Sequence, residues 1–252
     1  MYSFAGLFLS LQLLLAAVGA VPLTAAIWDS DTSSTGSNPF AECTIRTTTA
    51  SPSLDETKPQ LPPPSADLRL KYVTLGRGTQ NYTCASSDAS TVPVAVGAVA
   101  TLFDASWITS SFPKLLDQVP PLLEQIHLDN LTSAVGALRT PPAAHGHGGN
   151  LAIGKHYFTD PTTPFFDFRI SGLKDWAAAQ KNASVNAPAP SPAAVNDVST
   201  PDVAWLQLIA KDGVGIKEVY RVVTAGGSSP ATCEGQASGI EVQYAAQYWF
   251  YG

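Results

Sequence analysis

Histidine is the side chain with the widest chemistry in this sequence, and its four copies are His127, His145, His147 and His156. His145 and His147 stand in the segment His-Gly-His-Gly-Gly. Two neutral imidazoles there would suit a metal ion, because imidazole is the commonest protein ligand and glycine lets a loop fold around the ion. The same segment also fits a plain flexible loop, on which two ligands would bind a metal weakly. We therefore predict no metal or other cofactor, with His145 and His147 as weak candidate ligands.

His156 precedes Tyr157 and Phe158 in a predicted strand, which would fix the orientation of its ring. A fixed histidine can serve as a general base beside a carboxylate, and Asp160 and Asp167 follow it closely. This pattern gives an enzyme hypothesis, a hydrolase or a metal-dependent activity that uses His156 with one of these carboxylates. The opposing interpretation, which we favour, is a buried histidine that is hydrogen-bonded within the fold.

The common enzyme signatures are missing from the sequence. Residues 76–81, Gly-Arg-Gly-Thr-Gln-Asn, lack the third glycine of a dinucleotide-binding loop and lead into a strand pattern rather than a helix. No Gly-Lys-Ser/Thr phosphate loop, Gly-x-Ser-x-Gly elbow or His-Glu-x-x-His helix occurs. These absences disfavour a nicotinamide dehydrogenase and favour a protein without catalytic activity.

Three polar residues stand among apolar neighbours in predicted strands: Gln80, Arg221 and Thr224. An unpaired polar group in such a position would cost roughly 1–3 kcal/mol, so each needs a partner. The partners are either backbone groups and one another, which we favour, or a ligand in a cleft. Aromatic side chains exposed together would form a carbohydrate-stacking platform, although core packing is their usual role. The aromatic residues considered for a platform are Trp107, Trp205, Tyr248, Trp249 and Tyr251.

Strands have to position these residues, because the hydrophobic period of the sequence is mostly two. The clearest strand lies at 242–250, where every second residue from Val242 to Phe250 is apolar. Further strands are predicted at 68–74, 80–84, 94–103, 156–158, 165–170, 203–210 and 218–224.

One helical region interrupts the strands between Lys114 and His127, where apolar residues recur at spacings of three and four. Pro120 and Pro121 must divide it into two short helices, with Pro121 near the first turn of the second, because proline breaks a helix interior. We expect this insertion to pack on the sheet. The whole pattern predicts an all-β, mainly antiparallel fold, either a β-sandwich or a partly closed barrel with a short helical insertion.

The N-terminus predicts the destination of the protein. Residues 1–20 form an apolar run that ends in small residues, the pattern of a signal peptide. Residues 21–65 are rich in Ser, Thr and Pro and predict a flexible leader, because they bury too little apolar surface to fold. A single β domain would occupy 66–252, with a Pro- and Ala-rich loop at 182–200. The mature protein would be secreted, to the extracellular space or cell wall, without membrane association after cleavage.

Two further features are typical of an extracellular protein. Sequons for glycosylation occur at Asn81, Asn130 and Asn182. The three cysteines are Cys43, Cys84 and Cys233. Their spacing matches no metal or redox motif, and in an oxidising compartment they would give one disulfide and one unpaired thiol. All three pairings are open on this argument.

The charge balance narrows the range of partners. Lys and Arg number 14 and Asp and Glu number 20, so the formal net charge is −6. A chain without a basic excess has no field that would attract nucleic acid or anionic lipid. We therefore predict no nucleic-acid partner, and the sequence leaves the oligomeric state open.

Six blocks in order carry a resemblance, among them Gly-x-Gly-Thr-Gln-Asn-Tyr-Thr-Cys at 76–84 and Tyr-Arg-Val-x-Thr-x-Gly-Gly-x-x-Pro-x-x-Cys at 220–233. Over about residues 66–252 the chain resembles secreted fungal members of the family called domain of unknown function 3455. The family has no established activity. Fungal members often carry a malate dehydrogenase label, and the missing dinucleotide loop argues against it here. The residues that match family markers are Gln80, Tyr82, Cys84, His156, Arg221, Thr224 and Cys233.

The resemblance favours a Cys84–Cys233 disulfide, because both cysteines lie in matching blocks, and it leaves Cys43 unpaired. Our first hypothesis is a secreted or cell-wall-associated, noncatalytic protein that binds a cell-wall glycan or a host protein at a fungus–host interface. Secretion, aromatic-rich strands and the missing catalytic signatures motivate it. The alternative is the enzyme that uses His156. The candidate binding residues are Gln80, Tyr82, Arg221 and Thr224, and the candidate catalytic residues are His156 and Asp167.

Overall fold

The structure is a computed structural model, and it describes residues 50–128, 151–188 and 201–252. Several predicted features lie outside these ranges: the signal peptide, most of the leader, Cys43, Asn130, His145 and His147. Among the described residues, no helix is both long enough and apolar enough to cross a bilayer.

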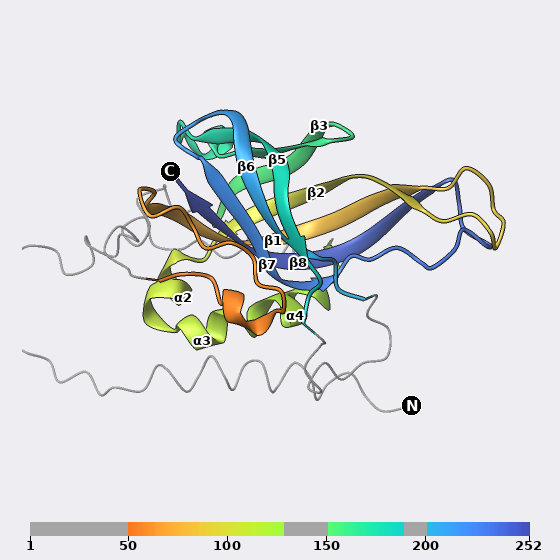
Figure 1. The fold of residues 1–252 in the computed structure, drawn as a ribbon, viewed down its shortest axis with the longest axis horizontal. Helices are drawn as coiled ribbons and strands as arrows, with labels where there is room; N and C mark the ends of the chain where they lie inside the picture. Colours follow the sequence, from red (N-terminus) through yellow and green to blue (C-terminus); the bar gives the residue numbers. More distant parts are fainter. Residues whose placement is uncertain (1–49, 129–150, 189–200) are drawn as a thin grey trace, which may run out of the picture. The chain divides into compact units, whose positions relative to one another are not determined.

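In the described part of the chain, eight antiparallel strands form a closed barrel, in which each strand pairs with the next and the last pairs with the first (Figure 1). The strands are β1 Leu70–Thr83, β2 Val94–Asp104, β3 Ala152–Asp160, β4 Thr163–Asp167, β5 Trp176–Val185, β6 Trp205–Val214, β7 Glu218–Gly226 and β8 Gly239–Tyr251. The predicted all-β antiparallel class is confirmed. Of the two predicted architectures the structure is the barrel, which closes fully because β8 pairs with β1.

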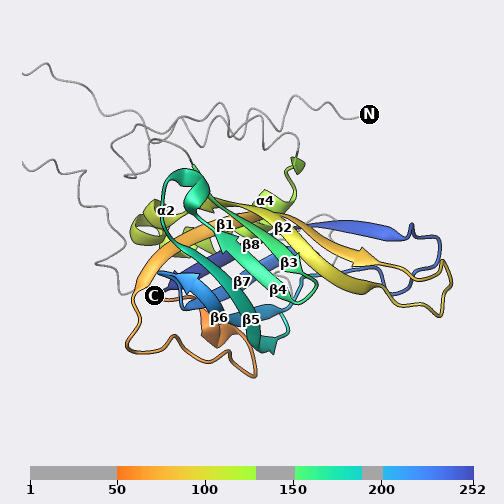
Figure 2. The same ribbon diagram turned by 90° about the horizontal axis from the view of Figure 1, so that it is seen from above.

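Three strands continue beyond the rest of the barrel. β1 and β8 pair over the whole of Leu70–Thr83, but β2 pairs with β3 only over residues 100–103, and β8 pairs with β7 only as far as Tyr244. The far ends of the three strands therefore pair only with one another and extend together away from the helices (Figures 1 and 2). We call this part the arm, which comprises residues 79–83, 94–99 and 239–243.

Short helices lie together against one side of the barrel (Figure 1). They are α2 Ser106–Ser111, α3 Pro113–Leu116 and α4 Val119–Glu124, and two 3-10 helices are η2 Leu54–Glu56 and η3 Arg169–Ser171. Pro120 and Pro121 lie in the first turn of α4, where the missing proline N–H breaks no helical hydrogen bond. The predicted pair of short helices, divided near these prolines, is confirmed.

Arg77 of β1 fastens α4 to the outside of the barrel. Its side chain is 1% exposed. Its guanidinium donates to the carbonyl oxygens of Leu123 (3.0 Å), Glu124 (2.8 Å) and Ile126 (2.9 Å) at the end of α4. The carbonyl groups at the C-terminal end of a helix carry partial negative charge and lack the full set of helical donors, so a cation with several donors is well suited to them.

The barrel interior, or lumen, is filled by side chains. Small residues of β2 and β5 face large aromatic residues of β4 and β8, which is how an eight-stranded barrel fills its interior. The large side chains that are no more than 1% exposed are Phe166, Phe168, Tyr244, Tyr248 and Phe250.

A second apolar cluster covers the outside of β1 and β6–β8, beneath the helices and the N-terminal segment. It includes Leu61, Leu116, Trp205, Tyr220 and Trp249. The sequence predicts a flexible leader through residue 65, but residues 50–65 pack here instead. Leu61 is only 3% exposed, and the hydroxyl of Tyr220 donates to the carbonyl oxygen of Pro62 at 3.0 Å. These contacts hold the segment against the barrel.

Two strands differ from the sequence-based expectation. The predicted strands 68–74 and 80–84 are one continuous strand, β1, because Gly76 and Gly78 lie inside it rather than in a turn. A Cβ on Gly76 would meet the Tyr248 ring at 2.4 Å, so the glycine makes room for a lumen side chain. β5 is an additional strand, and it places residues 182–185 in the barrel rather than in the predicted loop.

Candidate functional site

Three residues singled out in the sequence point toward the lumen, His156 and Arg221 from within the barrel and Gln80 from the base of the arm. Gln80 points inward from β1, His156 from β3 and Arg221 from β7, because each shares a face with lumen residues of the neighbouring strands. His156 is 3% exposed and Arg221 is 9% exposed, while Gln80 is half-buried. The sheet register therefore brings together an imidazole, a guanidinium and an amide from three distant parts of the chain.

Two tyrosines of β8 lie among these groups. The hydroxyls of Tyr244 and Tyr248 are 2.9 Å apart and hydrogen-bonded to each other. Burial raises the pKa of both phenols, so both are neutral at physiological pH. Gln80 lies close enough to Tyr244, and Arg221 close enough to Tyr248, to act in the opposite direction on those pKa values.

Several polar atoms in the lumen lack a partner. Nη2 of Arg221 donates to the carbonyl of Ala204 at 2.8 Å, but its Nε has no acceptor. Nε2 of Gln80 and Oγ1 of Thr74, which is opposite Tyr248 in the register, are also buried without a partner. Part of the predicted polar network therefore exists, and part of its hydrogen-bonding capacity is unused.

His156 is held as a neutral ring. Its Nδ1 lies 3.0 Å from the carbonyl oxygen of Phe165, which can only accept, so Nδ1 carries the proton. The ring stacks on Phe166 with centroids 4.4 Å apart. Burial lowers the pKa of His156 to about 4, with a smaller contribution from the positive charge of Arg221.

The other two candidate binding residues bond to backbone at the barrel end nearest the arm. Oγ1 of Thr224 donates to the carbonyl of Val203 at 2.6 Å. The hydroxyl of Tyr82 donates to the carbonyl of Gly227 at 2.7 Å. Both therefore hold chain segments across this end of the lumen.

The structure places the two candidate catalytic residues on opposite faces of the sheet. Asp167 is opposite Lys155 in the register and faces outward, whereas His156 faces the lumen. Nε and Nη2 of Arg169 each donate to Asp167 at 2.8 Å, and this pairing keeps the pKa of Asp167 below its usual value. Asp160 is the exposed last residue of β3, where the hydroxyl of Thr162 lowers its pKa to about 2.

In 50–128, 151–188 and 201–252, no three His, Cys, Asp or Glu side chains gather in a way that could hold a metal ion. His145 and His147 lie outside these ranges.

An aromatic ladder crosses the outer face of β3, β4 and β5. Tyr157 stacks against Phe165 with centroids 5.1 Å apart, and Phe165 stacks against Trp176 at 5.4 Å. The guanidinium of Arg169 lies over Phe165 and Trp176, 5.6 Å and 5.4 Å from the ring centroids, while it pairs with Asp167. Tyr157 and Trp176 are half-buried, so each presents part of its ring to solvent.

Sequence reasoning missed the aromatic ladder. Its members lie in three short strands whose mutual register the sequence does not reveal, and β5 was not predicted. The usable signal was one aromatic residue at an outward position in each consecutive strand. By contrast, four of the residues considered for a platform are buried: Trp205, Tyr248, Trp249 and Tyr251.

Trp249 borders a cavity on the outside of the barrel. The cavity has a volume of about 460 Å³ and lies between β8, the helices α2 and α3, and the segment that begins at Ala50. Its polar lining includes Lys114 and Asp117. Oδ1 of Asp117 accepts a hydrogen bond from the buried Gln247 at 2.8 Å, so this carboxylate already has a structural partner.

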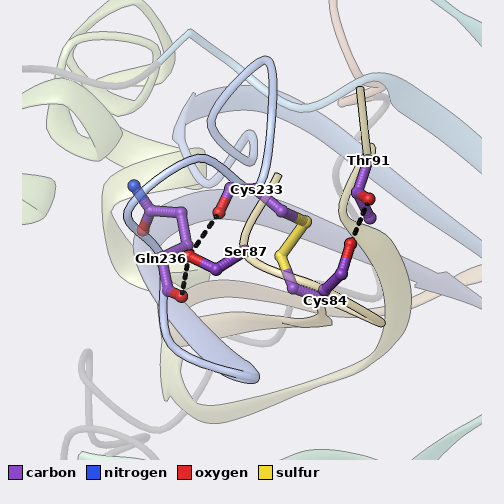
Figure 3. Close-up of a disulfide and its surroundings, with 6 residues drawn as sticks. Cys84, Ser87, Thr91, Cys233 and Gln236 are labelled. Carbon is purple, nitrogen blue, oxygen red and sulfur yellow. Dashed lines mark hydrogen bonds between the residues drawn. A yellow bond between two sulfur atoms is a disulfide. The ribbon is translucent and has the colours of Figure 1, made fainter. Parts of the chain in front are cut away.

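A disulfide joins Cys84, directly after β1, to Cys233, before β8. Cys233 is fully buried, and the nearby Ser87 hydroxyl reaches the carbonyl oxygens of Cys233 at 3.5 Å and Gln236 at 3.4 Å (Figure 3). The pairing expected from the resemblance is thus present in the structure. It ties together the two loops at the tip of the arm.

Two of the three sequons lie in described strands. Asn182 is exposed in β5, and its Nδ2 donates to Oε1 of Gln207 at 2.8 Å. Asn81 is half-buried in β1, and its Oδ1 accepts from Thr79 at 2.9 Å. Both amides thus hold defined positions on the barrel.

Comparison with known families places the whole barrel in one family. Residues 64–252, which include all eight strands and both half-cystines, match the family described as "Protein of unknown function (DUF3455)". The chain belongs to the DUF3455 family. No match was found among curated proteins or among solved structures. The candidate functional features of this DUF3455 protein are the lumen cluster, the outer cavity and the aromatic ladder.

Proposed function

We propose that this DUF3455 protein is a secreted, noncatalytic protein that binds cell-wall glycan through the aromatic ladder. The observation that carries the proposal is the ladder itself, a row of stacked rings with an ion pair beside it on the outer face of β3–β5. The helices pack elsewhere, on the side formed by β1 and β6–β8.

The chemistry of the ladder suits a polyhydroxylated chain. The rings of Tyr157 and Trp176 give an apolar surface for the C–H faces of sugar rings, and their polar tips remain free to reach water or hydroxyls. Asp167 accepts hydrogen bonds and Arg169 donates them, and Lys155 stands opposite Asp167 in the register. A sugar hydroxyl both donates and accepts, so it can use groups of either kind.

The lumen supports the noncatalytic part of the proposal. His156 is buried, neutral and bonded to a backbone carbonyl, and the carboxylate that would assist it faces the other side of the sheet. A general base needs both hydrogen-bond reach to its substrate and a suitable pKa, and His156 has neither in this arrangement.

The disulfide supports the extracellular part of the proposal. Cys84 and Cys233 are joined and largely buried, at 8% and 0% exposure. Stable structural disulfides form in oxidising compartments, which agrees with the signal peptide predicted at residues 1–20.

Retention on insoluble chitin, β-1,3-glucan and cellulose, followed by a glycan array, tests the proposal. We expect the wild-type protein to be retained by at least one polysaccharide. Trp176→Ala should weaken retention about tenfold, which corresponds to ~1.4 kcal/mol of lost ring contact. Arg169→Lys, which keeps the charge but loses the bidentate pair, should weaken it less.

Phe112→Ala is the matched control, because Phe112 is an exposed aromatic residue, 51% accessible, between α2 and α3. It should be retained like the wild type. Near-ultraviolet circular dichroism of each variant confirms that its barrel is intact. Failure of the wild-type protein to bind any polysaccharide or array glycan, or equal losses in Trp176→Ala and Phe112→Ala, would overturn the proposal.

A further inference from the structure

The guanidinium of Arg221 is a buried positive charge without a counterion. The side chain is 9% exposed, and in the described part of the chain it forms no ion pair, in contrast to Lys71 with Asp175 and Arg169 with Asp167. A buried charge is costly unless it is paired, and arginine does not lose its proton to avoid the cost. An anionic partner would therefore stabilise the buried charge of Arg221.

The groups around Arg221 do not supply that anion. Tyr82, Tyr244 and Tyr248 all have raised pKa values because they are buried, so their hydroxyls stay neutral at physiological pH. His156 is neutral as well. The carbonyl of Ala204 accepts from Nη2 of Arg221 but carries no net charge.

The unpartnered hydrogen-bond donors near Arg221 also favour an anionic partner. Nε of Arg221 and Nε2 of Gln80 can only donate, and neither atom has an acceptor among the residues that the structure describes. The unpartnered hydroxyl of Thr74 lies opposite Tyr248 in the register, and Tyr248 is in turn opposite Arg221. Two of these groups can only donate, and an acceptor with negative charge would both satisfy them and balance the charge of Arg221.

The surroundings limit the size of that component. Tyr244, Tyr248 and His156 are each no more than 3% exposed, so any group larger than a small anion would have to displace them. Gln80 and Tyr82 are half-buried at the barrel end nearest the arm, so an anion would approach from that end. A carboxylate is flat, offers two acceptor oxygens and pairs strongly with a guanidinium.

We propose that this end of the lumen binds a small carboxylate, which accepts hydrogen bonds from Arg221 with Gln80 as a second donor. The site is distinct from the aromatic ladder, which lies on the outside of the barrel. It does not depend on glycan binding.

Titration of the ¹⁵N-labelled protein with sodium acetate tests the proposal, observed at the arginine side-chain Nε–H resonances. We expect a saturable shift of the Arg221 signal, assigned by its absence in Arg221→Lys. Gln80→Leu should weaken acetate binding about tenfold, the effect of one hydrogen bond to a charged group. The exposed Arg169 provides an internal control whose signal should shift only weakly and without saturation.

Parallel titrations with sodium chloride and sodium phosphate at matched ionic strength identify the anion class. Saturation by acetate alone, or by acetate at much lower concentration, supports the proposal. Equal saturation by chloride or phosphate, an Arg221 signal that follows Arg169, or a persistent exchange peak from an ordered water at Nε would each overturn it. Trp176→Ala should bind acetate like the wild type, so this result is separable from glycan binding. If Arg221→Lys fails to fold, the wild-type and Gln80→Leu titrations still decide the outcome.

Discussion

At the scale of single residues, Gly76 shows how tightly the lumen is filled. A Cβ added there would lie 2.4 Å and 2.8 Å from two ring atoms of Tyr248, which is itself 1% exposed and has no room to withdraw. We expect Gly76→Ala to lower the free energy of unfolding by about 1–3 kcal/mol, the usual cost of overpacking a core. Urea denaturation followed by tryptophan fluorescence measures the change.

Gly239→Ala is the matched control for this substitution. Gly239 also lies in a strand, at the start of β8, but no atom lies within 4 Å of its added Cβ. Its stability should change by less than ~0.5 kcal/mol. Equal effects of the two substitutions would contradict the expectation, because they would mean that the Tyr248 side chain can move to make room for the added methyl group.

His156 should make the protein sensitive to acid. The unfolded chain binds the imidazole proton near pH 6.5 and the folded protein near pH 4, so the unfolded state holds more protons between these values. Stability should therefore fall as the pH drops through this window, by up to about 3 kcal/mol from this residue. Urea denaturation at pH 7 and pH 4.5 measures the loss.

The pH dependence can be assigned to His156 in two ways. His156→Leu should show a smaller loss of stability over the same pH range, because the titrating group is gone. If that variant does not fold, the proton resonances of the wild-type imidazole still report its pKa. A titration midpoint near the ordinary value of 6.5 would contradict the expected shift.

The fate of individual residues shows what sequence can predict at this scale. Gln80, Arg221 and Thr224 were selected because a polar group within an apolar pattern needs a partner, and that argument holds in any fold. Trp176 was missed because it matters only as a neighbour of Phe165. The two residues become neighbours only once their strands are aligned. A residue whose role follows from its own burial can be predicted from the sequence. A residue whose role depends on a neighbour in another strand can be predicted only when the strand register is known.

At the scale of elements, Arg77 decides how the helical insertion is held. It donates to three carbonyl oxygens in and just after α4, at Leu123, Glu124 and Ile126. We expect Arg77→Leu to cost roughly 2–4 kcal/mol, because several part-buried carbonyls lose a donor at once. Hydrogen exchange should show faster exchange in α4 than in the wild type.

Lys181→Leu is the control for Arg77→Leu, because Lys181 is an exposed cation within β5. Its stability should stay within ~0.5 kcal/mol of the wild type. Unchanged exchange in α4 of Arg77→Leu would show that apolar packing alone holds the helix.

The disulfide should stabilise the arm and with it the barrel. Cys84 and Cys233 are 149 residues apart, so the crosslink closes a long loop in the unfolded chain. By the chain-entropy relation, the double variant Cys84→Ser, Cys233→Ser should lose about 5 kcal/mol. Equilibrium urea unfolding measures the loss, and Ser87→Ala, which leaves the bond intact, is the control. A double variant as stable as Ser87→Ala would contradict the expectation.

The elements themselves were predictable to different degrees. The two short helices were predicted correctly because proline has a fixed steric effect on helices at any site. β5 was not predicted because its core positions, Ala177 and Ala179, are small residues with low strand propensity. They suit the barrel core only because large aromatic side chains face them. The break expected in β1 was wrong for the same kind of reason, since Gly76 serves packing against Tyr248 rather than a turn.

At the scale of the whole molecule, the sequence predicted the class of fold but not its closure. Alternation of apolar and polar residues reports that strands have two faces, which holds for sandwiches and barrels alike. Whether β8 returns to β1 depends on the tilt and stagger accumulated over all eight strands. The total tilt and stagger of eight strands cannot be predicted from any single stretch of the sequence.

Removal of β8 should prevent the barrel from forming. A chain that ends at Ser238 keeps both cysteines but leaves β1 and β7 as open edges and exposes the lumen. We expect this chain to show no cooperative urea transition, and a synthetic peptide of residues 239–252 added during refolding should restore one. Cooperative unfolding of the truncated chain alone would contradict this expectation.

The pairing of the first strand with the last also bears on how the protein is made. Leu70 of β1 leaves the ribosome long before Tyr251, its partner across the seam. Until β8 has been translated, the nascent chain carries an unpaired strand edge and an exposed apolar inner surface, which makes it prone to aggregation. We expect chaperones to bind the chain during this interval and to release it once β8 can pair with β1.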